Sequence, residues 1–307
     1  MKKSTRQAYG EALVELGKVN ENVVVLDADL SGSTKTNLFK KEFPKRHFNV
    51  GIAEADLMGT AAGFATCGKV AFASTFAMFA AGRAFEQIRN TIAYPKLNVK
   101  IAPTHAGISV GEDGGSHQSV EDISLMRSIP GMVVLSPADA VETKKMIFAA
   151  AEYNGPVYIR MGRLDVDVLF DDNYDFQIGV ANTLTEGNDV TIAATGVMVA
   201  EALKAAEILA KDGISVRVIN VGTIKPLDGE TILKAAKETK FIVTAEEHSV
   251  IGGLGSAISE FLGEVHPTKI KKLGIYDKFG QSGKGQELLE KYELTAAKLV
   301  EIVKENM

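Results

Sequence analysis

The chain has 307 residues, with 34 Lys and Arg against 39 Asp and Glu, and a formal net charge of -5. Its 46% hydrophobic and 24% charged residues are typical of a globular protein with a sizeable core, and they exclude fibrous and disordered classes. The mildly acidic balance argues against nucleic acid as the main partner, because a phosphate backbone demands a positive surface. The length favours two domains.

The cysteine content and the apolar runs bear on location. Cys67 is the single cysteine, so an internal disulfide is excluded, and a reducing, cytoplasmic setting fits best. The N-terminal residues lack the apolar region of a signal peptide. The longest apolar run, 70–82, includes Ser74 and Thr75 and is too short to span a bilayer. We therefore expect a cytoplasmic protein without a membrane contact.

Short runs rich in Val and Ile alternate with helical patterns in the first half of the chain. This alternation is typical of a mostly parallel sheet with helices on both faces. The expected strands are 23–27, 48–51, 70–74, 99–104, 132–136 and 157–161. The expected helices are 4–18, 53–67, 76–94, 120–128 and 138–153. Pro137 stands just before the last helix, where proline is favoured.

The helical and strand periodicity fades after Leu164 and returns near Val190. We predict a first domain over 1–165, a linker over 166–188 and a second domain over 189–307. The second domain shows another alternating series of strands and helices. Its expected strands are 190–195, 216–221, 241–245 and 270–275, and its expected helices are 197–211, 294–304 and the segments after Asp228 and Gly253.

The most informative segment is 104–118, THAGISVGEDGGSHQ, directly after an expected strand. Two histidines bracket four glycines and an adjacent Glu-Asp pair. Ligands in open α/β sheets bind at the carboxyl ends of strands, glycine lets the backbone approach a ligand, and histidine transfers protons near neutral pH. A glycine-rich surface turn would explain a lone histidine, but the whole cluster favours a functional site.

Two further segments follow expected strands. Glu54 begins a helix, where an acid commonly complements the helix dipole; alternatively, it is a buried carboxylate that shares a proton with a bound heterocycle. Phe76 and Phe79 share a helix face, so they are either core residues or a slot for a flat ring. Asp27 to Ser33 also follow a strand and carry hydroxyls and acids toward the same edge.

Together these segments resemble transketolase, the thiamine-diphosphate enzyme that moves two-carbon units between sugar phosphates, over essentially the whole chain. The most specific match is the family motif GVGEDG-x-x-HQ, present here as 109–118 with Ser109 at the first glycine. Shorter matches are 28–30, 51–54, 75–79, 136–139, 247–248 and 252–255. The resemblance implies an α/β pyrimidine-binding domain with a parallel sheet, followed by a smaller α/β C-terminal domain.

Residue by residue, the resemblance makes Glu54 the carboxylate that hydrogen-bonds the aminopyrimidine of the cofactor, with Phe76 and Phe79 lining the pocket of that ring. His117 matches the position that assists proton removal from the donor hydroxyl, and Asp113 the position that reads a substrate hydroxyl. The positions that hold the sugar phosphate are matched by Arg6, Ser33, His105 and Arg160.

The sequence departs from the family pattern in two ways. Ala53 and Ala55 replace the Arg and His that flank the glutamate in many relatives, and a third pocket aromatic lines up near Gly82, with Phe85 close by. The family's GDG motif and its downstream Asn segment, which hold the diphosphate and its cation, do not occur.

These absent motifs imply the C-terminal subunit of a split transketolase. An N-terminal subunit on another chain would carry the diphosphate and hold the divalent cation, Mg²⁺ or Ca²⁺, so no metal ligand is expected here. The expected assembly is a dimer of heterodimers. Alternatives are the beta subunit of a 2-oxoacid dehydrogenase, a deoxyxylulose-phosphate-synthase-like enzyme, and a non-catalytic binding or regulatory module.

Overall fold

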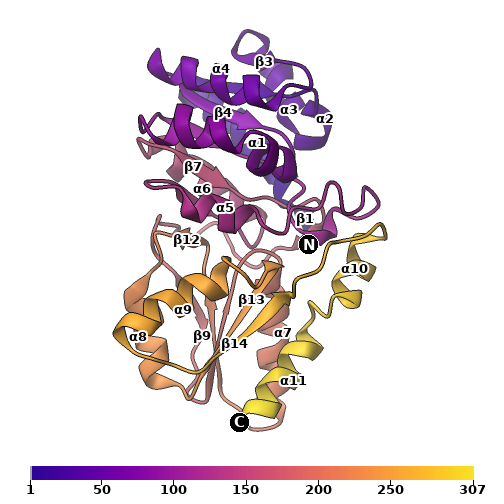
Figure 1. The fold of residues 1–307 in the computed structure, drawn as a ribbon, viewed down its shortest axis with the longest axis vertical. Helices are drawn as coiled ribbons and strands as arrows, with labels where there is room; N and C mark the ends of the chain where they lie inside the picture. Colours follow the sequence, from indigo (N-terminus) through magenta and orange to yellow (C-terminus); the bar gives the residue numbers. More distant parts are fainter. Residues whose placement is uncertain (1) are drawn as a thin grey trace.

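Two α/β domains, one after the other along the chain, make up the computed structural model, which describes residues 2–307 (Figure 1). The first contains a seven-stranded sheet in the order β12-β6-β7-β5-β4-β2-β3. Its parallel strands are β2 (Val23–Asp27), β3 (His47–Asn49), β4 (Val70–Ser74), β5 (Val99–Ile101), β6 (Val133–Leu135) and β7 (Val157–Ile159). The predicted α/β organisation is confirmed.

Helices cover both faces of this sheet because alternate strand residues point to opposite sides. Val23 and Val25 pack with α1 (Thr5–Val19) and α6 (Ala140–Glu152), whereas Val24 and Leu26 pack with α4 (Glu54–Thr66) and α5 (Asp122–Ser128). The short helices α2 (Ser31–Thr34), α3 (Thr36–Glu42) and η1 (Pro44–Arg46) connect β2 to β3.

The second domain contains a five-stranded sheet in the order β14-β13-β10-β11-β9, in which β9 alone is antiparallel to its neighbour. Its strands are β9 (Asn182–Thr185), β10 (Val190–Ala194), β11 (Val216–Asn220), β13 (Ile242–Ser249) and β14 (Ile270–Ile275). One face is covered by α7 (Met198–Lys211) and α11 (Ala296–Asn306), and the other by α8 (Gly229–Glu238) and α9 (Leu254–Val265). Helix α10 (Gly285–Lys291) precedes α11.

The two halves of the chain also share strands. β12 (Thr223–Lys225) belongs to the second half of the sequence but pairs antiparallel with β6 at the edge of the first sheet. At the start of the interval predicted as a linker, β8 (Asp165–Asp167) pairs with β1 (Lys2–Ser4). Near the end of that interval, β9 forms the edge strand of the second sheet. Both domains are therefore joined by backbone pairing as well as by the connecting segment.

One expected helix is present but differs in type. The segment 76–94, predicted as a single helix, contains two π-helical stretches, η2 (Met78–Arg83) and η3 (Gln87–Ala93). π-Helical turns insert a residue into the helical repeat and are frequent at functional sites. Over residues 2–307, no helix has the length and apolar character needed to cross a membrane.

Candidate functional site

The candidate site lies at the carboxyl edge of the first sheet, where the segments after β2, β3, β4 and β5 meet. β4 and β5 continue past their ends, since Phe76 forms a bridge with Thr104 and the Ala77 amide donates to the Thr104 carbonyl at 2.8 Å. This pairing places Phe76 directly beside His105. Their rings stack, with centroids 3.9 Å apart and planes 24° apart.

Two more rings complete an aromatic group at this edge. Phe76 and Phe79 stack with centroids 5.8 Å apart, and the His117 ring meets Phe79 edge-on at 5.3 Å. Phe76 is buried, whereas Phe79 and His117 are half-buried. The structure therefore brings together His105, His117 and both phenylalanines, and leaves part of the group open to a ligand.

His105 is held in an unusual conformation and environment. Its backbone has a φ of 61°, which is uncommon for a residue other than glycine. Its Nδ1 lies 2.8 Å from the Thr104 hydroxyl, and the ring is buried. Burial, together with the charges of Arg6 and Arg163, lowers the pKa of His105 to about 3. The ring is therefore neutral at pH 7.

Positive side chains surround His105. Arg6 lies near the start of α1 and donates from Nη1 to the Ser33 carbonyl at 3.0 Å. Burial and then Arg163 lower the pKa of Arg6, so the two guanidinium groups repel each other. Arg163 donates to the Val110 carbonyl and to Glu112, the latter at 2.8 Å. Such crowding of cations favours an anionic ligand.

Arg163 is absent from the residues that the sequence singles out for phosphate binding. It follows β7 at the carboxyl edge of the sheet, a signal that Arg160 shares, so sequence position alone does not choose between the two. Arg160, which was singled out, is 6% exposed, and its Nε lies 2.9 Å from Oδ2 of the fully buried Asp122. Its Nη2 donates to the Glu247 carbonyl at 2.9 Å. The structure places Arg160 in the interface between the domains and not in the cationic cluster, which consists of Arg6 and Arg163.

Glu54 is the first residue of α4 and is 3% exposed. Both its carboxylate oxygens lie 2.9 Å from Nη1 of Arg83, whose guanidinium also stacks 4.5 Å from the centre of the Phe79 ring. Arg83, and not a third aromatic ring, lies against Phe79, while Phe85 packs against the core. The chain of contacts from Glu54 through Arg83 and Phe79 leads to His117.

A cavity of about 350 Å³ opens beside these contacts. It is lined by residues of η2, of the glycine-rich loop and of the second domain: Met78, Phe79, Arg83, Ser116, Gln118 and Phe279. Asp113 is exposed on the same loop, between Gly111 and Gly114, which have φ angles of 92° and 76°. Both conformations favour glycine. The loop therefore presents His117 between two residues that line the cavity, Ser116 and Gln118, and holds Asp113 on its exposed turn.

Several buried polar atoms around the site have no hydrogen-bond partner. They are Arg6 Nε, Thr75 Oγ1, Gln118 Oε1 and Ser119 Oγ. Unsatisfied buried polar atoms cost about 1–3 kcal/mol each, so such a group is typical of a place that a ligand completes. The flat rings of Phe76 and Phe79 and the buried carboxylate of Glu54 fit an aromatic heterocycle with polar substituents. Over residues 2–307, no group of three or more His, Cys, Asp or Glu has the geometry of a metal site.

Comparisons with known proteins agree with this geometry. Residues 1–167 match the family model of the transketolase pyrimidine binding domain, and residues 179–299 match that of the transketolase C-terminal domain. A Methanocaldococcus jannaschii protein provisionally named a transketolase C-terminal section is 54% identical over 308 residues, covering 99% of this chain and 96% of its own.

Two further relatives cover nearly the whole chain. A 6-deoxy-6-sulfo-D-fructose transketolase subunit of a Clostridium species is 44% identical over 295 residues, covering 96% of this chain and 92% of its own. A solved structure of a split-gene transketolase, an inactive β4 tetramer, has a TM-score of 0.92 at 56% identity and covers 98% of this chain and 97% of its own. The chain therefore belongs to the transketolase family, as a subunit of the split type that carries the pyrimidine-binding and C-terminal domains.

Proposed function

We propose that this chain acts with a separate diphosphate-binding subunit as a transketolase, which transfers a two-carbon ketol unit from a ketose to an aldose. The observation that carries the proposal is one sheet edge that holds a buried carboxylate, a flat aromatic group, a histidine next to a cavity and a cationic cluster. The family implies thiamine diphosphate as the cofactor, which supplies the electron sink for the two-carbon unit.

Glu54, Phe76 and Phe79 are the residues that would hold the aminopyrimidine ring. A buried carboxylate beside flat rings provides a hydrogen-bond acceptor for a ring nitrogen and a stacking surface. In this chain Arg83 now pairs with that carboxylate, but the Arg83 side chain is 54% exposed. Arg83 is therefore free to turn toward solvent when another donor takes its place at Glu54.

His117 and Asp113 act on the sugar in this proposal. His117 is half-buried beside the cavity, a position that suits a ring that contacts the sugar and takes up a proton from it. The proton that leaves the donor hydroxyl during carbon–carbon cleavage passes to His117. Asp113 accepts a hydrogen bond from a substrate hydroxyl. The neutral His105 ring orients a polar group of the substrate without adding charge.

The cationic cluster holds the terminal anion of the sugar. Arg6 offers an unpaired buried Nε, and Arg163 offers a guanidinium that is half-exposed beside Glu112. Ser33 lies next to Arg6. We expect Arg163 to take the phosphate-binding role that the sequence resemblance gives to Arg160. A sulfonate is also an anion that guanidinium groups bind, which agrees with the sulfosugar in the name of the Clostridium relative.

The partner subunit would hold the cofactor diphosphate and its cation, Mg²⁺ or Ca²⁺. Support comes from relatives of similar length that are named as a section or a subunit of a transketolase. The natural assembly in this proposal is a dimer of heterodimers in the cytoplasm. The 2-oxoacid dehydrogenase, deoxyxylulose-phosphate synthase and non-catalytic readings are not favoured by these relatives.

The test mixes the chain with a diphosphate-binding transketolase subunit, cofactor and Mg²⁺. Ketol transfer from xylulose 5-phosphate to ribose 5-phosphate is followed in a coupled assay, with pyruvate plus glyceraldehyde phosphate and a 2-oxoacid as competing substrates. We expect activity only in the mixture, and a loss of roughly a thousandfold in kcat for Glu54→Ala with assembly intact by light scattering. Wild-type turnover by this variant, or metal-dependent cofactor binding by the chain alone, would refute the proposal.

An Arg163→Met variant separates the two arginines. We expect it to raise the KM for phosphorylated sugars while kcat changes little, because the phosphate is remote from the reacting carbons. An Arg160→Met variant is the matched control, and its KM should remain at the wild-type value in the fraction that folds.

A further inference from the structure

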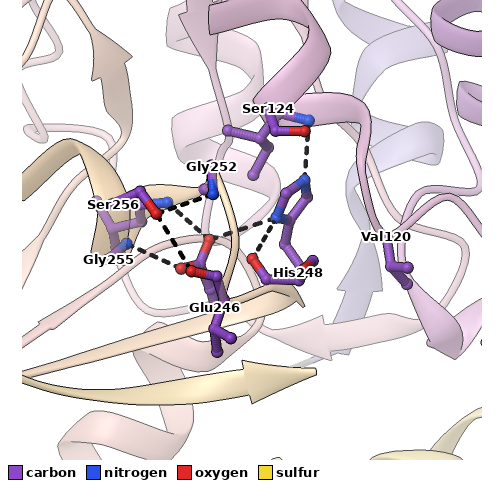
Figure 2. A network of polar contacts seen from close by, with 12 residues as sticks. Val120, Ser124, Glu246, His248, Gly252, Gly255 and Ser256 are labelled. Carbon is purple, nitrogen blue, oxygen red and sulfur yellow. Dashed lines mark hydrogen bonds and ion pairs between the residues drawn. The ribbon is translucent and has the colours of Figure 1, made fainter. Parts of the chain in front are cut away.

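The end of β13 places three consecutive polar residues between the domains. Alternate residues of a strand face opposite sides. Glu246 and His248 lie together on one side, near Gly252, Gly255 and Ser256 at the start of α9 (Figure 2). Glu247 points the other way, toward the first domain, where its carboxylate accepts from the Ser109 amide.

Glu246 caps the start of helix α9 within the second domain. Its carboxylate accepts hydrogen bonds from the amides of Leu254 at 2.7 Å and Gly255 at 2.9 Å, which are the first residues of α9. Amides at a helix start otherwise lack partners, and a carboxylate there is favourable. The glycine-rich turn 252–255 is therefore satisfied by the chain's own acid.

Glu247 instead contacts the glycine-rich loop of the first domain. It is 3% exposed, and its Oε1 accepts from the backbone amide of Ser109 at 2.6 Å. A Cβ added to Gly107 would overlap the Glu247 carboxylate, so the acid lies directly against the loop backbone. Gly107 has a φ of 80°. This contact occurs between His105 and the turn that carries Asp113 and His117.

The strand end that carries Glu247 is itself fixed to the first domain. The Glu247 carbonyl accepts from Nη2 of Arg160 at 2.9 Å, and Arg160 pairs with the buried Asp122. Two residues on, the Ser249 amide donates to the Val120 carbonyl at 2.7 Å. The carboxylate therefore projects from a backbone held on both sides, and it has a defined position against the loop.

The loop needs such support. His105 has a φ of 61° and Gly111 a φ of 92°, so several residues lie outside the ordinary regions of backbone space. Strained backbone of this kind costs about 1–3 kcal/mol at a non-glycine residue and persists only where the surroundings hold it. Besides Glu247, Gln118 braces the loop, since its Nε2 donates to the carbonyls of Ile108 and Gln281 at 2.9 Å.

We propose that Glu247, supplied by the C-terminal domain, is a positioning residue of the active site, which fixes the loop 105–118 and through it His105, Asp113 and His117. The catalytic consequence rests on the proposed function, whereas the anchoring of the loop does not. The proposal gives the C-terminal domain a part in the reaction, although none of its residues is required to touch the reacting atoms.

The test uses three variants at Glu247 and one matched control. Glu247→Met removes the acceptor at nearly constant size, and Glu247→Asp keeps the charge but withdraws it by one methylene from the Ser109 amide. Glu247→Gln keeps an oxygen able to accept. Glu246→Met removes the neighbouring buried acid, which contacts α9 and not the loop. Amide hydrogen exchange of the full chain, read by mass spectrometry, and kcat of the two-subunit enzyme are measured for each.

We expect exchange over 105–118 to rise at least tenfold in Glu247→Met and Glu247→Asp, with 252–262 unchanged, and Glu247→Gln to restore protection. In Glu246→Met we expect exchange to rise over 252–262 and to stay unchanged over 105–118. Misplacement of a catalytic group by 1 Å lowers the rate by roughly a hundredfold. In Glu247→Met and Glu247→Asp we therefore expect kcat to fall by about tenfold or more, while the KM for the cofactor stays within about twofold of the wild-type value.

Unchanged protection of 105–118, or faster exchange throughout the chain, would overturn the proposal, as would local exposure of the loop with wild-type kcat. If Glu247→Met fails to fold, Glu247→Asp carries the same comparison. An inactive wild-type mixture would refute the proposed function instead, and the exchange data would still decide whether Glu247 anchors the loop.

Discussion

The buried ion pair between Asp122 and Arg160 gives a prediction that separates a structural from a substrate-binding role. Asp122 is fully buried and Arg160 is 6% exposed. The Arg160 Nε lies 2.9 Å and 3.1 Å from the two carboxylate oxygens, and the Tyr158 hydroxyl donates to the same carboxylate at 2.9 Å. Replacing Asp122 with Ala leaves Nε of Arg160 and the Tyr158 hydroxyl without their acceptor, while Nη2 of Arg160 keeps the Glu247 carbonyl.

Removing one partner of a buried pair costs about 3–5 kcal/mol, because the remaining charge stays desolvated and uncompensated. For a domain of this size, each kcal/mol shifts the melting temperature by about 2–4 °C. We therefore expect Asp122→Ala to lower the melting temperature of the isolated chain by roughly 6–20 °C. The double variant Asp122→Ala with Arg160→Met should recover part of this loss, since neither charge is then buried alone.

The assay is thermal unfolding of the isolated chain for the melting temperature and urea unfolding for the free energy, both followed by circular dichroism, with the four corners of the double-mutant cycle compared. Asp165→Ala is a surface control, because that residue is exposed at the start of β8. A loss below about 1 kcal/mol for Asp122→Ala would refute the reasoning. So would an Arg160→Met enzyme of normal stability with a raised KM for sugar phosphates, because it would show that Arg160 contacts substrate.

Three further predictions follow from groups described above or buried nearby. His105, with a pKa lowered to about 3, should remain neutral from pH 8 to pH 5 in histidine NMR spectra, with the signal assigned by His105→Asn; a midpoint near 6.5 would contradict this. Glu142 is buried under Tyr174, and burial raises its pKa to about 7. The fold therefore binds more protons than the unfolded chain between about pH 4.5 and 7. Stability should fall as pH rises through this window, and Glu142→Gln should flatten the slope measured by urea unfolding. A Cβ on Gly187 would overlap the backbone of Val216, so Gly187→Ala should cost about 1–3 kcal/mol by the same measurement, whereas Gly263→Ala, with open space around it, should not destabilise.

The sheet strands are the part of the fold that the sequence predicts best. β2, β4 and β14 are observed at their predicted bounds. Every residue of β2 and β4 is buried, and a run buried on both faces is a strong local signal. The two π-helical stretches in 76–94 escaped prediction, since one inserted residue leaves the apolar spacing close to that of an ordinary helix. β12 also escaped it, because its partner β6 lies about ninety residues earlier and local pattern carries no trace of that pairing.

The candidate site likewise has one part that sequence order predicts and another part that depends on tertiary contacts. Glu54, Phe76, Phe79, His105 and His117 are brought together because each follows a strand of one parallel sheet, which is a rule that sequence order alone can apply.

The arginines were harder to assign. Arg160 and Arg163 follow the same strand, and which of them lies near Arg6 depends on Asp122, a buried partner of Arg160 that is distant in the sequence. Glu247 likewise acts from the other domain, so its role depends on tertiary contacts.

Because strand β12 of the second half of the chain completes the first sheet, the two domains cannot be separated cleanly into fragments. Its register with β6 runs from Thr223 opposite Leu135 to Lys225 opposite Val134, and it covers what would otherwise be the outer edge of the first sheet. A fragment cut at the junction of the two family matches would expose the amides and carbonyls of β6 to any other open strand, and exposed edges of this kind promote aggregation. The first domain owes its closed border to a segment that lies outside its own sequence, so a separate first domain without that segment should aggregate more readily than the whole chain.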